Sequence, residues 1–318
     1  MTNAAPDFAA IEAAAARIAP HAQRTPVLRS RTLDALAGAQ LFFKCEHLQR
    51  AGAFKFRGAC NAVWSLDEEE ALRGVVTHSS GNHGAALALA ARTRGIPAHV
   101  VVPQGAVRAK LAAIEAYGAT LHECAPTMAA REQTAARVQA STGATFVHPY
   151  TDPRVIAGQG TAALELFDEV GALDALITPI GGGGLVGGSA IAARAIDPMA
   201  ALYAAEPSGA ADAYESLRCG ERVTHIEADT VCDGLRATIG EVNFDLLRQH
   251  AVDVLPVTDT DTVAAMNLLW QRMKQLVEPS SATVLAAVLA HPEHFAGRRV
   301  GVILSGGNVD PRFFCDRP

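Results

Sequence analysis

Lys55 is the residue of this sequence that is best placed to act as a nucleophile. It lies in the run AGAFKFRG (51–58), directly before the helical pattern RGACNAVWSL. A helix start and apolar neighbours both lower the pKa of an amine, which favours the neutral form that makes a Schiff base. A solvated lysine at a helix start is the alternative interpretation. The other lysines are weaker candidates, because Lys44 lies within a predicted strand and Lys110 and Lys274 lie in predicted long helices.

A second chemical feature is a run of four glycines, Gly181, Gly182, Gly183 and Gly184, between the apolar run ALITPI and the helical pattern LVGGSAIAARAI. Successive backbone N–H groups and a helix dipole would point to one place there, which is how proteins bind phosphate. The run has neither the GxGxxG spacing of a dinucleotide site nor the lysine of a P-loop. It predicts a phosphate cradle, with a plain strand-to-helix turn as the alternative.

Two further turns, SSGNHG (79–84) and SGGN (305–308), also follow predicted strands. The first offers hydroxyls, an amide and exposed N–H groups, which is the set needed to hold a carboxylate and a phenolic oxygen. A helix N-cap is the alternative for the first turn, and a C-terminal turn is the alternative for the second. Three such turns and one framed lysine together are far more specific than any one of them.

The elements that position these residues alternate along almost the whole chain. We expect strands at 41–47, 74–80, 98–103, 120–124, 145–149, 175–180, 201–207 and 298–305, with helical patterns between them. This alternation is typical of an α/β fold in which helices flank parallel-rich sheets. We expect a large domain made of residues 1–66 and 149–318, and a small domain made of residues 67–148. Ligands of such folds bind at the carboxyl ends of the strands.

The composition excludes several classes of protein. Hydrophobic residues make up 49% of the 318 residues and charged residues 19%, and the net charge is −6, which argues against disorder and nucleic-acid binding. The first twenty residues lack the features of a signal peptide, and no stretch approaches the ~20 apolar residues of a membrane span. The six cysteines are scattered, so we expect reduced thiols without zinc. These features predict a cytoplasmic protein that acts on small molecules.

The runs AFKFRGA, SSGNHG, GGGGL and SGGN, in this order and spacing, resemble the fold-type II pyridoxal-phosphate enzymes of the serine racemase and threonine dehydratase family. The resemblance extends from about residue 20 to about residue 310 and includes TPVL, FFKCEHLQ and VIAGQGTAALELF. It implies a two-lobed fold similar to the β subunit of tryptophan synthase. It also implies pyridoxal 5′-phosphate as the cofactor.

The resemblance assigns the cofactor contacts to residues of this chain. Lys55 would form the Schiff base, Asn82 would contact the phenolic O3′, and Ser305 would bond to the pyridine nitrogen. The phosphate would bind to Gly181, Gly182, Gly183, Gly184 and Leu185. A neutral serine does not enforce a pyridinium, so the ring is a weaker electron sink, and expulsion of a β-leaving group is favoured over transamination.

The resemblance also gives Ser80 a role beside Lys55. Lys55 would be the base on one face of the substrate α-carbon, and Ser80, as in serine racemases, would lie on the opposite face. Threonine dehydratases resemble SAGNH at this point. Two bases permit racemisation, whereas one permits only elimination, and the alternative role of Ser80 is to hold the substrate carboxylate. Ser79, Asn82 and His83 complete the expected substrate-binding turn.

Glu206, Ala210 and Asp212, in AEPSGAADAYES, match the divalent-cation site of the family, with two carboxylates and one backbone carbonyl. Hard oxygen ligands suit Mg²⁺, or Ca²⁺ or Mn²⁺ in its place. A solvated acidic loop is the alternative interpretation. Ala53 is a departure, because the family usually has serine two residues before the lysine. This departure bears on substrate positioning and not on the Schiff base.

Arg131, in TMAAREQTAARV, and Arg236, in CDGLRATIGE, are candidates to pair with a second substrate carboxylate. Such a pair would turn the preference towards 3-hydroxyaspartate. A solvated surface arginine is the alternative interpretation of each.

We therefore expect an ammonia-lyase that converts serine, threonine or threo-3-hydroxyaspartate into an α-keto acid and ammonia. Serine or aspartate racemisation is the main alternative, and β-replacement fits less well because its lysine context differs from FKFRG. A non-catalytic protein that binds pyridoxal phosphate or another ligand on the same scaffold is the remaining alternative. The resemblance also implies a homodimer and ATP as an effector.

Overall fold

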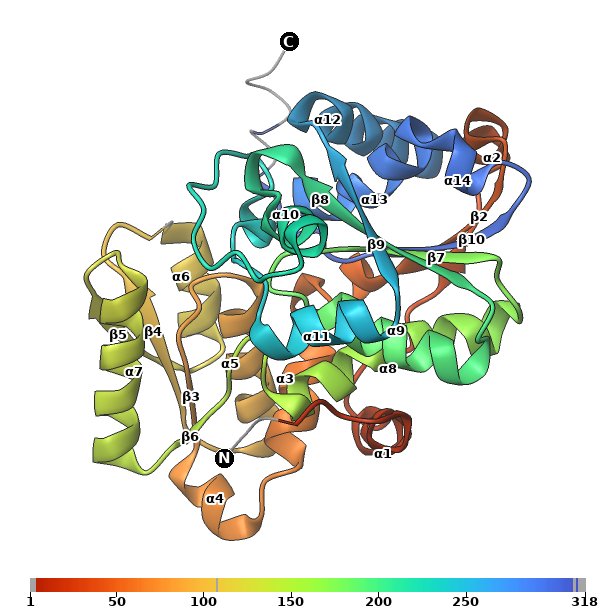
Figure 1. Cartoon of the computed structure of the whole chain (residues 1–318). Coiled ribbons are helices and arrows are strands. Elements are labelled where there is room, and N and C mark those ends of the chain that lie inside the picture. The colour runs from red at the N-terminus through yellow and green to blue at the C-terminus, as the bar shows by residue number, and fades with distance from the viewer. Residues whose placement is uncertain (1–3, 107, 311–312, 314–318) are drawn as a thin grey trace.

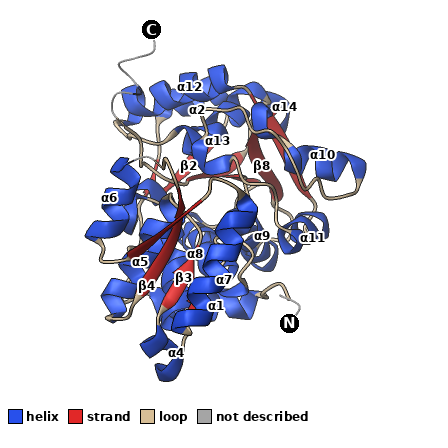
Figure 2. Ribbon diagram, turned by 90° about the vertical axis from the view of Figure 1, so that its left-hand side faces the viewer, coloured by secondary structure: helices blue, strands red, loops and turns tan. Residues whose placement is uncertain are grey.

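The computed structural model consists of two parallel-rich sheets with helices on both sides (Figure 2). It describes residues 4–106, 108–310 and 313. The larger sheet has the strand order β1-β2-β10-β7-β8-β9: Val27–Leu28, Gln40–Cys45, Arg299–Leu304, Ala175–Pro179, Ala201–Pro207 and Val252–Val257. The smaller sheet has the order β5-β4-β3-β6: Thr120–Cys124, Ala98–Pro103, Val75–Thr77 and Thr145–Phe146. Among these named strands, only the pair β1 and β2 is antiparallel. The predicted α/β fold class is confirmed.

Side chains of the larger sheet alternate between two apolar cores, as the period of a strand requires. Phe42 and Leu176 pack in one core, whose helices α8 and α9 lie below the sheet in Figure 1. The helices of that core are α1, α8, α9 and α11: Phe8–Ile18, Pro153–Val170, Gly184–Ile196 and Glu241–Gln249. Leu41, Phe43 and Ile177 pack on the opposite face. The helices there are α2, α12, α13 and α14: Arg31–Ala37, Asp259–Leu268, Pro279–Ala290 and Pro292–Phe295.

The smaller sheet, on the left in Figure 1, is covered in the same way. Val100 packs towards α5 and α6, whereas Val76 and Val101 pack towards α7. These helices span Asn82–Arg94, Arg108–Ala116 and Met128–Thr142. The remaining α-helices are α3, α4 and α10: Lys55–Trp64, Glu68–Arg73 and Asp212–Cys219. The strands of this sheet fall inside the expected small domain, whose boundaries at 67 and 148 stay a prediction.

All eight predicted strands are present, most of them with shorter ends, and two strands were missed. β1 contains only two residues, which is too short for an alternating pattern. β9 reads VDVLPV, in which Asp253 and Pro256 interrupt the apolar run. This strand lies at the edge of its sheet, which is where a proline is tolerated.

Glycines set the spacing of the helices that carry Lys55 and the glycine turn. A Cβ on Gly158 of α8 would lie 2.6 Å from the Cα of Gly58 in α3. A Cβ on Gly160 would lie 2.7 Å from the carbonyl oxygen of Gly188 in α9. Because real Cβ atoms do not come this close to backbone, α8 makes backbone contact with α3 on one side and with α9 on the other.

The other lysines differ from the sequence interpretation in two places. Lys44 is fully buried, and its Nζ donates to Glu165 at 2.7 Å and to the carbonyl oxygen of Thr25 at 2.6 Å. Lys274 does not lie in a long helix, because it follows the π-helical turn Leu269–Met273 with a φ of +60°. Lys110 lies in α6, and its side chain is outside the described part of the structure.

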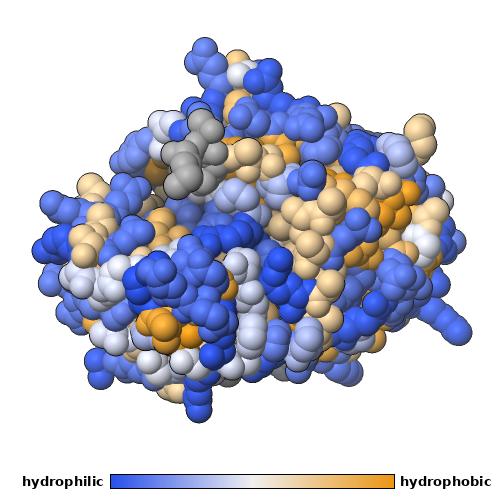
Figure 3. Space-filling view, turned by 90° about the horizontal axis from the view of Figure 1, so that it is seen from below, coloured by the Kyte–Doolittle hydropathy of each residue, from blue (hydrophilic) through white to orange (hydrophobic). Residues whose placement is uncertain are grey.

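No helix of the described residues is long and apolar enough to cross a membrane. Figure 3 shows a face on which hydrophilic residues predominate between smaller hydrophobic patches. Cys45, Cys60, Cys124 and Cys232 are buried free thiols, Cys219 is an exposed one, and Cys315 lies outside the described residues.

Candidate active site

Lys55 is the first residue of α3, and the chain just before it is tied to the SGGN turn after β10. The N–H of Phe54 donates to the carbonyl oxygen of Ser305 at 2.9 Å. The N–H of Gly307 donates to the carbonyl oxygen of Gly52, also at 2.9 Å. These two bonds hold Lys55 at the carboxyl end of β10, next to one of the predicted turns.

Lys55 is half-buried, and its amine contacts a carbonyl oxygen and an aromatic ring. Its Nζ donates to the carbonyl oxygen of Pro149 at 2.9 Å and lies 5.0 Å from the centre of the Phe54 ring. Burial lowers the pKa of Lys55 to about 8, although the carboxylate of Glu278 acts in the opposite direction. A larger fraction of this amine is therefore neutral near neutral pH than of an exposed lysine, which is the direction that the sequence predicts.

The four glycines form a turn that side chains would block. Gly183 has a φ of +91°, and a Cβ there would lie 2.6 Å from the Cβ of Asn243. A Cβ on Gly182 would overlap the ring of Tyr150. Helix α9 begins at Gly184, so its first N–H groups have no acceptor within the helix. This cradle fits a phosphate group.

Hydrogen bonds to the carbonyl oxygen of Gly182 orient the cradle. That oxygen accepts from the N–H of Gly240 at 3.1 Å and from Nδ2 of Asn243 at 2.6 Å. Asn243 Nδ2 also donates to the carbonyl oxygen of Tyr150 at 2.8 Å. Because a trans peptide places C=O and N–H on opposite sides, the N–H of Gly183 faces away from these donors. Leu185 follows as the second residue of α9 and is buried.

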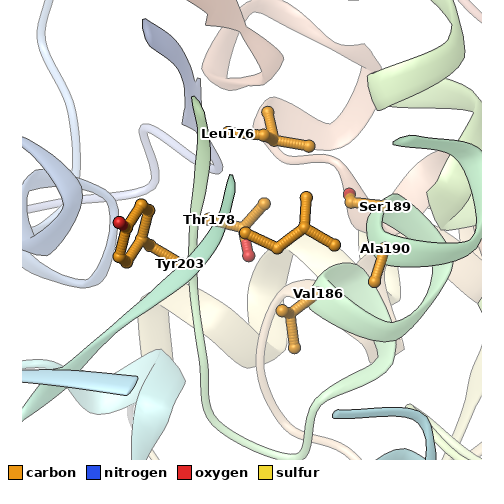
Figure 4. Close-up of a pocket in the computed structure, with 7 residues that line it drawn as sticks. Leu176, Thr178, Val186, Ser189, Ala190 and Tyr203 are labelled. Atoms are coloured by element: carbon orange, nitrogen blue, oxygen red, sulfur yellow. The ribbon is translucent and has the colours of Figure 1, made fainter. Parts of the chain in front are cut away.

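A cavity of about 10 Å³ lies between helix α9 and strands β7 and β8 (Figure 4). Leu176, Val186 and Tyr203 are among its lining residues. Thr178 and Ser189 also line it, and their buried hydroxyls have no hydrogen-bond partner among the described residues. A cavity of this size holds one water molecule, which would satisfy both hydroxyls, and it is too small for a substrate.

Asn82 begins α5 and contacts residues that are distant in sequence. Its Nδ2 donates to both carboxylate oxygens of Glu278, at 3.0 and 3.1 Å. Its Oδ1 accepts from Nδ2 of Asn308 at 2.9 Å. The N-cap of α5 is Gly81, which makes no side-chain capping bond. The interpretation of SSGNHG as a side-chain-capped helix start is therefore wrong.

These partners fix which way the Asn82 amide points. Its oxygen faces a donor, and one N–H of its nitrogen faces the single carboxylate of Glu278. An amide nitrogen has two N–H groups, so the second is left for another acceptor. This arrangement fits the expected contact of Asn82 with a phenolic oxygen.

Glu278 was not predicted from the sequence. Its carboxylate is only 4% exposed and lies at the N-cap of α13. Its backbone N–H donates to the carbonyl oxygen of Gly306 at 3.0 Å. The signal that could have found it is an acid directly before Pro279, at the start of an apolar helix. Tyr150, Asn243 and Asn308 were not assigned roles either.

Uncharged histidines lie near Lys55. His83 is 2% exposed, and neither ring nitrogen has a hydrogen-bond partner within the described residues. Burial and the charge of Lys55 hold the pKa of His83 well below its usual value. Burial, with His78 and Lys55 nearby, also lowers the pKa of His148 to about 3. These rings are neutral at neutral pH and offer no positive charge to a substrate.

The remaining predicted contacts lie at strand ends. Ser79 and Ser80 are half-buried between β3 and α5, directly before the turn of Gly81, whose N–H donates to Oγ of Ser79 at 3.4 Å. Ser305 is 3% exposed and directly follows β10.

The two candidate arginines have different surroundings. Arg131, in α7, is half-buried, and its buried Nε has no hydrogen-bond partner within the described residues. Burial lowers the pKa of His78, which directly precedes Ser79, and the charge of Arg131 contributes to this shift. Arg236 is exposed, and its Nη2 donates to the carbonyl oxygen of Thr230 at 2.5 Å.

Glu206, Ala210 and Asp212 lie together where β8 passes into α10. All three are buried, at 0%, 2% and 1% exposed. Burial raises the pKa of Glu206 to about 8 and that of Asp212 to about 6, and the charge of Asp212 contributes to the rise for Glu206. Oδ1 of Asp212 is buried and has no hydrogen-bond partner in the part of the chain that the structure describes. Two desolvated carboxylates with an unused oxygen fit a hard divalent cation, and the alternative of a solvated acidic loop is wrong.

Comparison with known proteins identifies the family. Residues 18–306 match the model of the pyridoxal-phosphate dependent enzymes, and the chain belongs to this family. The β-hydroxyaspartate dehydratase of Paracoccus denitrificans is 48% identical over 305 residues, which cover 96% of this chain and 97% of that protein. The serine racemase of Dictyostelium discoideum is 48% identical over 306 residues, which cover 94% of each chain. The structure of maize serine racemase matches with a TM-score of 0.94 at 44% identity, covering 98% of this chain and 96% of that one.

These findings confirm the resemblance seen in the sequence and the two-lobed fold type. They also confirm that the protein is an enzyme that uses pyridoxal phosphate, so the non-catalytic alternative is set aside.

The carboxylate of Glu278 near Lys55 predicts how the rate of cofactor uptake by the apoenzyme depends on pH. Schiff-base formation requires the neutral amine. The rate of Schiff-base formation after adding pyridoxal phosphate should therefore rise with pH, with a midpoint at about 8. Glu278→Gln removes the carboxylate that raises the pKa of Lys55, so this midpoint should move to lower pH. Stopped-flow absorbance over a pH series that brackets the midpoint measures the shift.

Glu69→Gln is the control for this shift, because Glu69 is an exposed carboxylate paired with Arg73 on α4. The control should keep the wild-type midpoint. A midpoint in Glu278→Gln that equals or exceeds the wild-type value would show that this carboxylate does not act on Lys55.

Proposed function

We propose that this enzyme is an ammonia-lyase that dehydrates and deaminates a β-hydroxy amino acid, with threo-3-hydroxyaspartate as its preferred substrate and serine and threonine as weaker ones. The observation that carries the proposal is the desolvated amine of Lys55, with its lowered pKa, at the SGGN turn. The printed names of the relatives, a β-hydroxyaspartate dehydratase and serine racemases, support the substrate class.

The predicted cofactor contacts and the residues of the SSGNHG turn each have a task in this proposal, whereas Arg236 has none. Gly181, Gly182, Gly183, Gly184 and Leu185 bind the cofactor phosphate, Asn82 donates to its phenolic oxygen, and Ser305 bonds to its ring nitrogen. When bound, pyridoxal phosphate supplies a sink for the electron pair left at the substrate α-carbon. The substrate carboxylate is held by the N–H groups and hydroxyls of the turn that contains Ser79, Ser80, Asn82 and His83.

Lys55 holds and moves the proton in the proposed reaction. Its neutral amine takes the proton from the α-carbon, and the β-hydroxyl then leaves with a proton as water. Water later replaces the nitrogen, which leaves as ammonia. The water lost and the water gained cancel, so the hydroxy amino acid yields an α-keto acid and ammonia without any oxidant.

Racemisation is a second candidate activity, supported by Ser80. This residue is half-buried two positions before Asn82, in the turn that would hold the substrate carboxylate. A hydroxyl on the face opposite Lys55 would return a proton with inverted configuration. The relatives named serine racemase support this candidate.

The direct test is a panel of D- and L-serine, D- and L-threonine, and the 3-hydroxyaspartate diastereomers. We expect the holoenzyme to release keto acid fastest from a threo-3-hydroxyaspartate. Lys55→Ala should abolish this release, because no other lysine amine of the described side chains lies in the proposed site. Enantiomer exchange, scored by chiral chromatography, should fall in Ser80→Ala while keto-acid release remains. Keto acid released by Lys55→Ala at the wild-type rate would refute the proposed role of the lysine.

Arg131 carries the proposed preference for a dicarboxylic substrate. A charge-assisted bond to a second carboxylate contributes about 1.5–3 kcal/mol, or roughly 10- to 100-fold in rate. Arg131→Gln should therefore lower kcat/KM for threo-3-hydroxyaspartate by that factor and change kcat/KM for serine much less.

Arg236→Gln is the matched control, since Arg236 is exposed and bonded to the backbone of Thr230. We expect it to leave the ratio of the two kcat/KM values close to that of the wild type. An equal loss on serine and on hydroxyaspartate in Arg131→Gln would rule out pairing with the second carboxylate.

We further propose that Glu206, Asp212 and the carbonyl oxygen of Ala210 bind Mg²⁺, or Ca²⁺ or Mn²⁺ in its place. The support is the buried Oδ1 of Asp212, which has no partner, beside a second buried carboxylate. A cation would offset the desolvation and mutual repulsion of the two carboxylates.

Chelation of this metal should lower the melting temperature of the protein. Adding Mg²⁺ back should restore it in the wild type, because a ligand that binds only the folded state stabilises that state. Asp212→Asn should remove the Mg²⁺ response, whereas Glu215→Gln, on the exposed side of the same helix, should keep it. An unchanged melting temperature and turnover after exhaustive chelation would count against the site.

The homodimer, ATP as an effector and the cytoplasmic location remain predictions of the family resemblance and of the sequence.

A further inference from the structure

Three side chains with metal-binding chemistry lie together at the far end of α13. This helix begins beside Glu278, which contacts Asn82, and ends at Ala290. Its twelve residues span about 18 Å. His291, Glu293 and His294 follow directly, and their ligand atoms all lie within 4.8 Å of one another. No residue proposed to bind the cofactor or the substrate belongs to this cluster.

The distances within this cluster are close to those of a metal site. Nδ1 of His291 lies 3.3 Å from Oε1 of Glu293, and Nε2 of His294 lies 3.8 Å from the same oxygen. A tetrahedral ion with bonds of about 2.1 Å separates neighbouring ligand atoms by about 3.4 Å. Small rotations of exposed side chains would therefore bring all three atoms onto one ion.

The second ring nitrogen of His294 has a partner that orients the ring. Its Nδ1 lies 3.4 Å from the hydroxyl of Tyr203, and the two ring centres are 5.2 Å apart. Tyr203 is a buried residue of β8, so its hydroxyl is a fixed point. A histidine that binds a metal through one nitrogen usually bonds through the other to such a group, which fixes its tautomer and orientation.

The ligand types select the kind of ion. Two imidazoles and one carboxylate suit Zn²⁺ and neighbouring transition metals, whereas Mg²⁺ and Ca²⁺ prefer oxygen ligands alone. The side chains of His291, Glu293 and His294 are 29%, 62% and 36% exposed, so an ion can enter from solvent and keep a water ligand. This chemistry differs from that of the oxygen site at Glu206.

We propose that His291, Glu293 and His294 form a surface site for a divalent transition metal of the zinc class, with water as the fourth ligand. The bound ion crosslinks the end of α13 to α14 and, through the Tyr203 contact, fixes that segment against β8. It is separate from the proposed reaction at Lys55, so its binding stabilises the fold without being required for turnover.

The test is a titration of the holoenzyme with Zn²⁺, followed by calorimetry, in buffer that contains saturating Mg²⁺ to fill the oxygen site. We expect one equivalent of Zn²⁺ per chain and a higher melting temperature when it is bound. His291→Gln and His294→Gln should each weaken this binding by about tenfold or more and remove the rise in melting temperature. The d–d absorption of added Co²⁺ reports whether the ion is tetrahedral.

Two further variants make the test specific. Tyr203→Phe keeps the ring and removes only the hydroxyl, so it should weaken binding about tenfold without loss of fold. His122→Gln is the matched control, because Nε2 of His122 lies 3.1 Å from Nδ1 of His99 in a pair of imidazoles without a third ligand among the described residues. It should bind Zn²⁺ as the wild type does.

Three outcomes would overturn the proposal. They are the absence of a stoichiometric Zn²⁺ equivalent, binding that survives both His291→Gln and His294→Gln, and an equal loss in His122→Gln. Keto-acid formation that depends on Zn²⁺ would contradict the separation of this site from the reaction.

Discussion

The position of the active site depends on the ion pairs that the buried guanidinium of Arg57 makes. Arg57 is fully buried, and its Nε and Nη2 donate to the carboxylates of Glu46 and Glu165, each at 2.7 Å. These carboxylates belong to the turn after β2 and to α8, so one side chain joins three segments. Removal of one partner would leave a buried charge uncompensated, which costs about 3–5 kcal/mol. The start of α3, two residues before Arg57, cannot move independently of this network.

The same turn of α3 thus holds one cation that stays charged and one amine that is partly neutral. Burial disfavours the charge of both side chains, and their partners decide the outcome. Two carboxylates raise the pKa of Arg57 above its usual value. Lys55 has a neutral carbonyl oxygen and the more distant influence of Glu278, whose carboxylate is shared with Asn82, so its pKa falls to about 8. A guanidinium suits the structural role and an amine suits the chemical one.

Features with a local signature could be predicted from the sequence, whereas features made by distant contacts could not. The run AFKFRG and the four glycines carry their chemistry in adjacent residues, so Lys55 and the cradle were found. Asn82 and Glu278 are 196 residues apart, and nothing near Glu278 marks it as part of the site beyond an acid before a proline. Lys44 resembles an ordinary strand lysine because its partner, Glu165, is 121 residues away. The edge strand β9 was missed because its sequence pattern does not indicate a strand. Its packing in the sheet makes it one.

The charges around the site explain why the proposed preference for a dicarboxylic substrate would need an arginine. A cofactor phosphate, the carboxylate of Glu278 and the α-carboxylate of a substrate already place several negative charges close together. A second substrate carboxylate adds repulsion that the nearby histidines cannot offset, because burial keeps His83 and His148 uncharged at neutral pH. Lys55 must itself be neutral to act as a base. Arg131 is a guanidinium cation, and its buried Nε has no acceptor among the described residues. A dicarboxylic substrate would supply that acceptor, whereas serine would leave it unsatisfied, so the same side chain both attracts one substrate and disfavours the other.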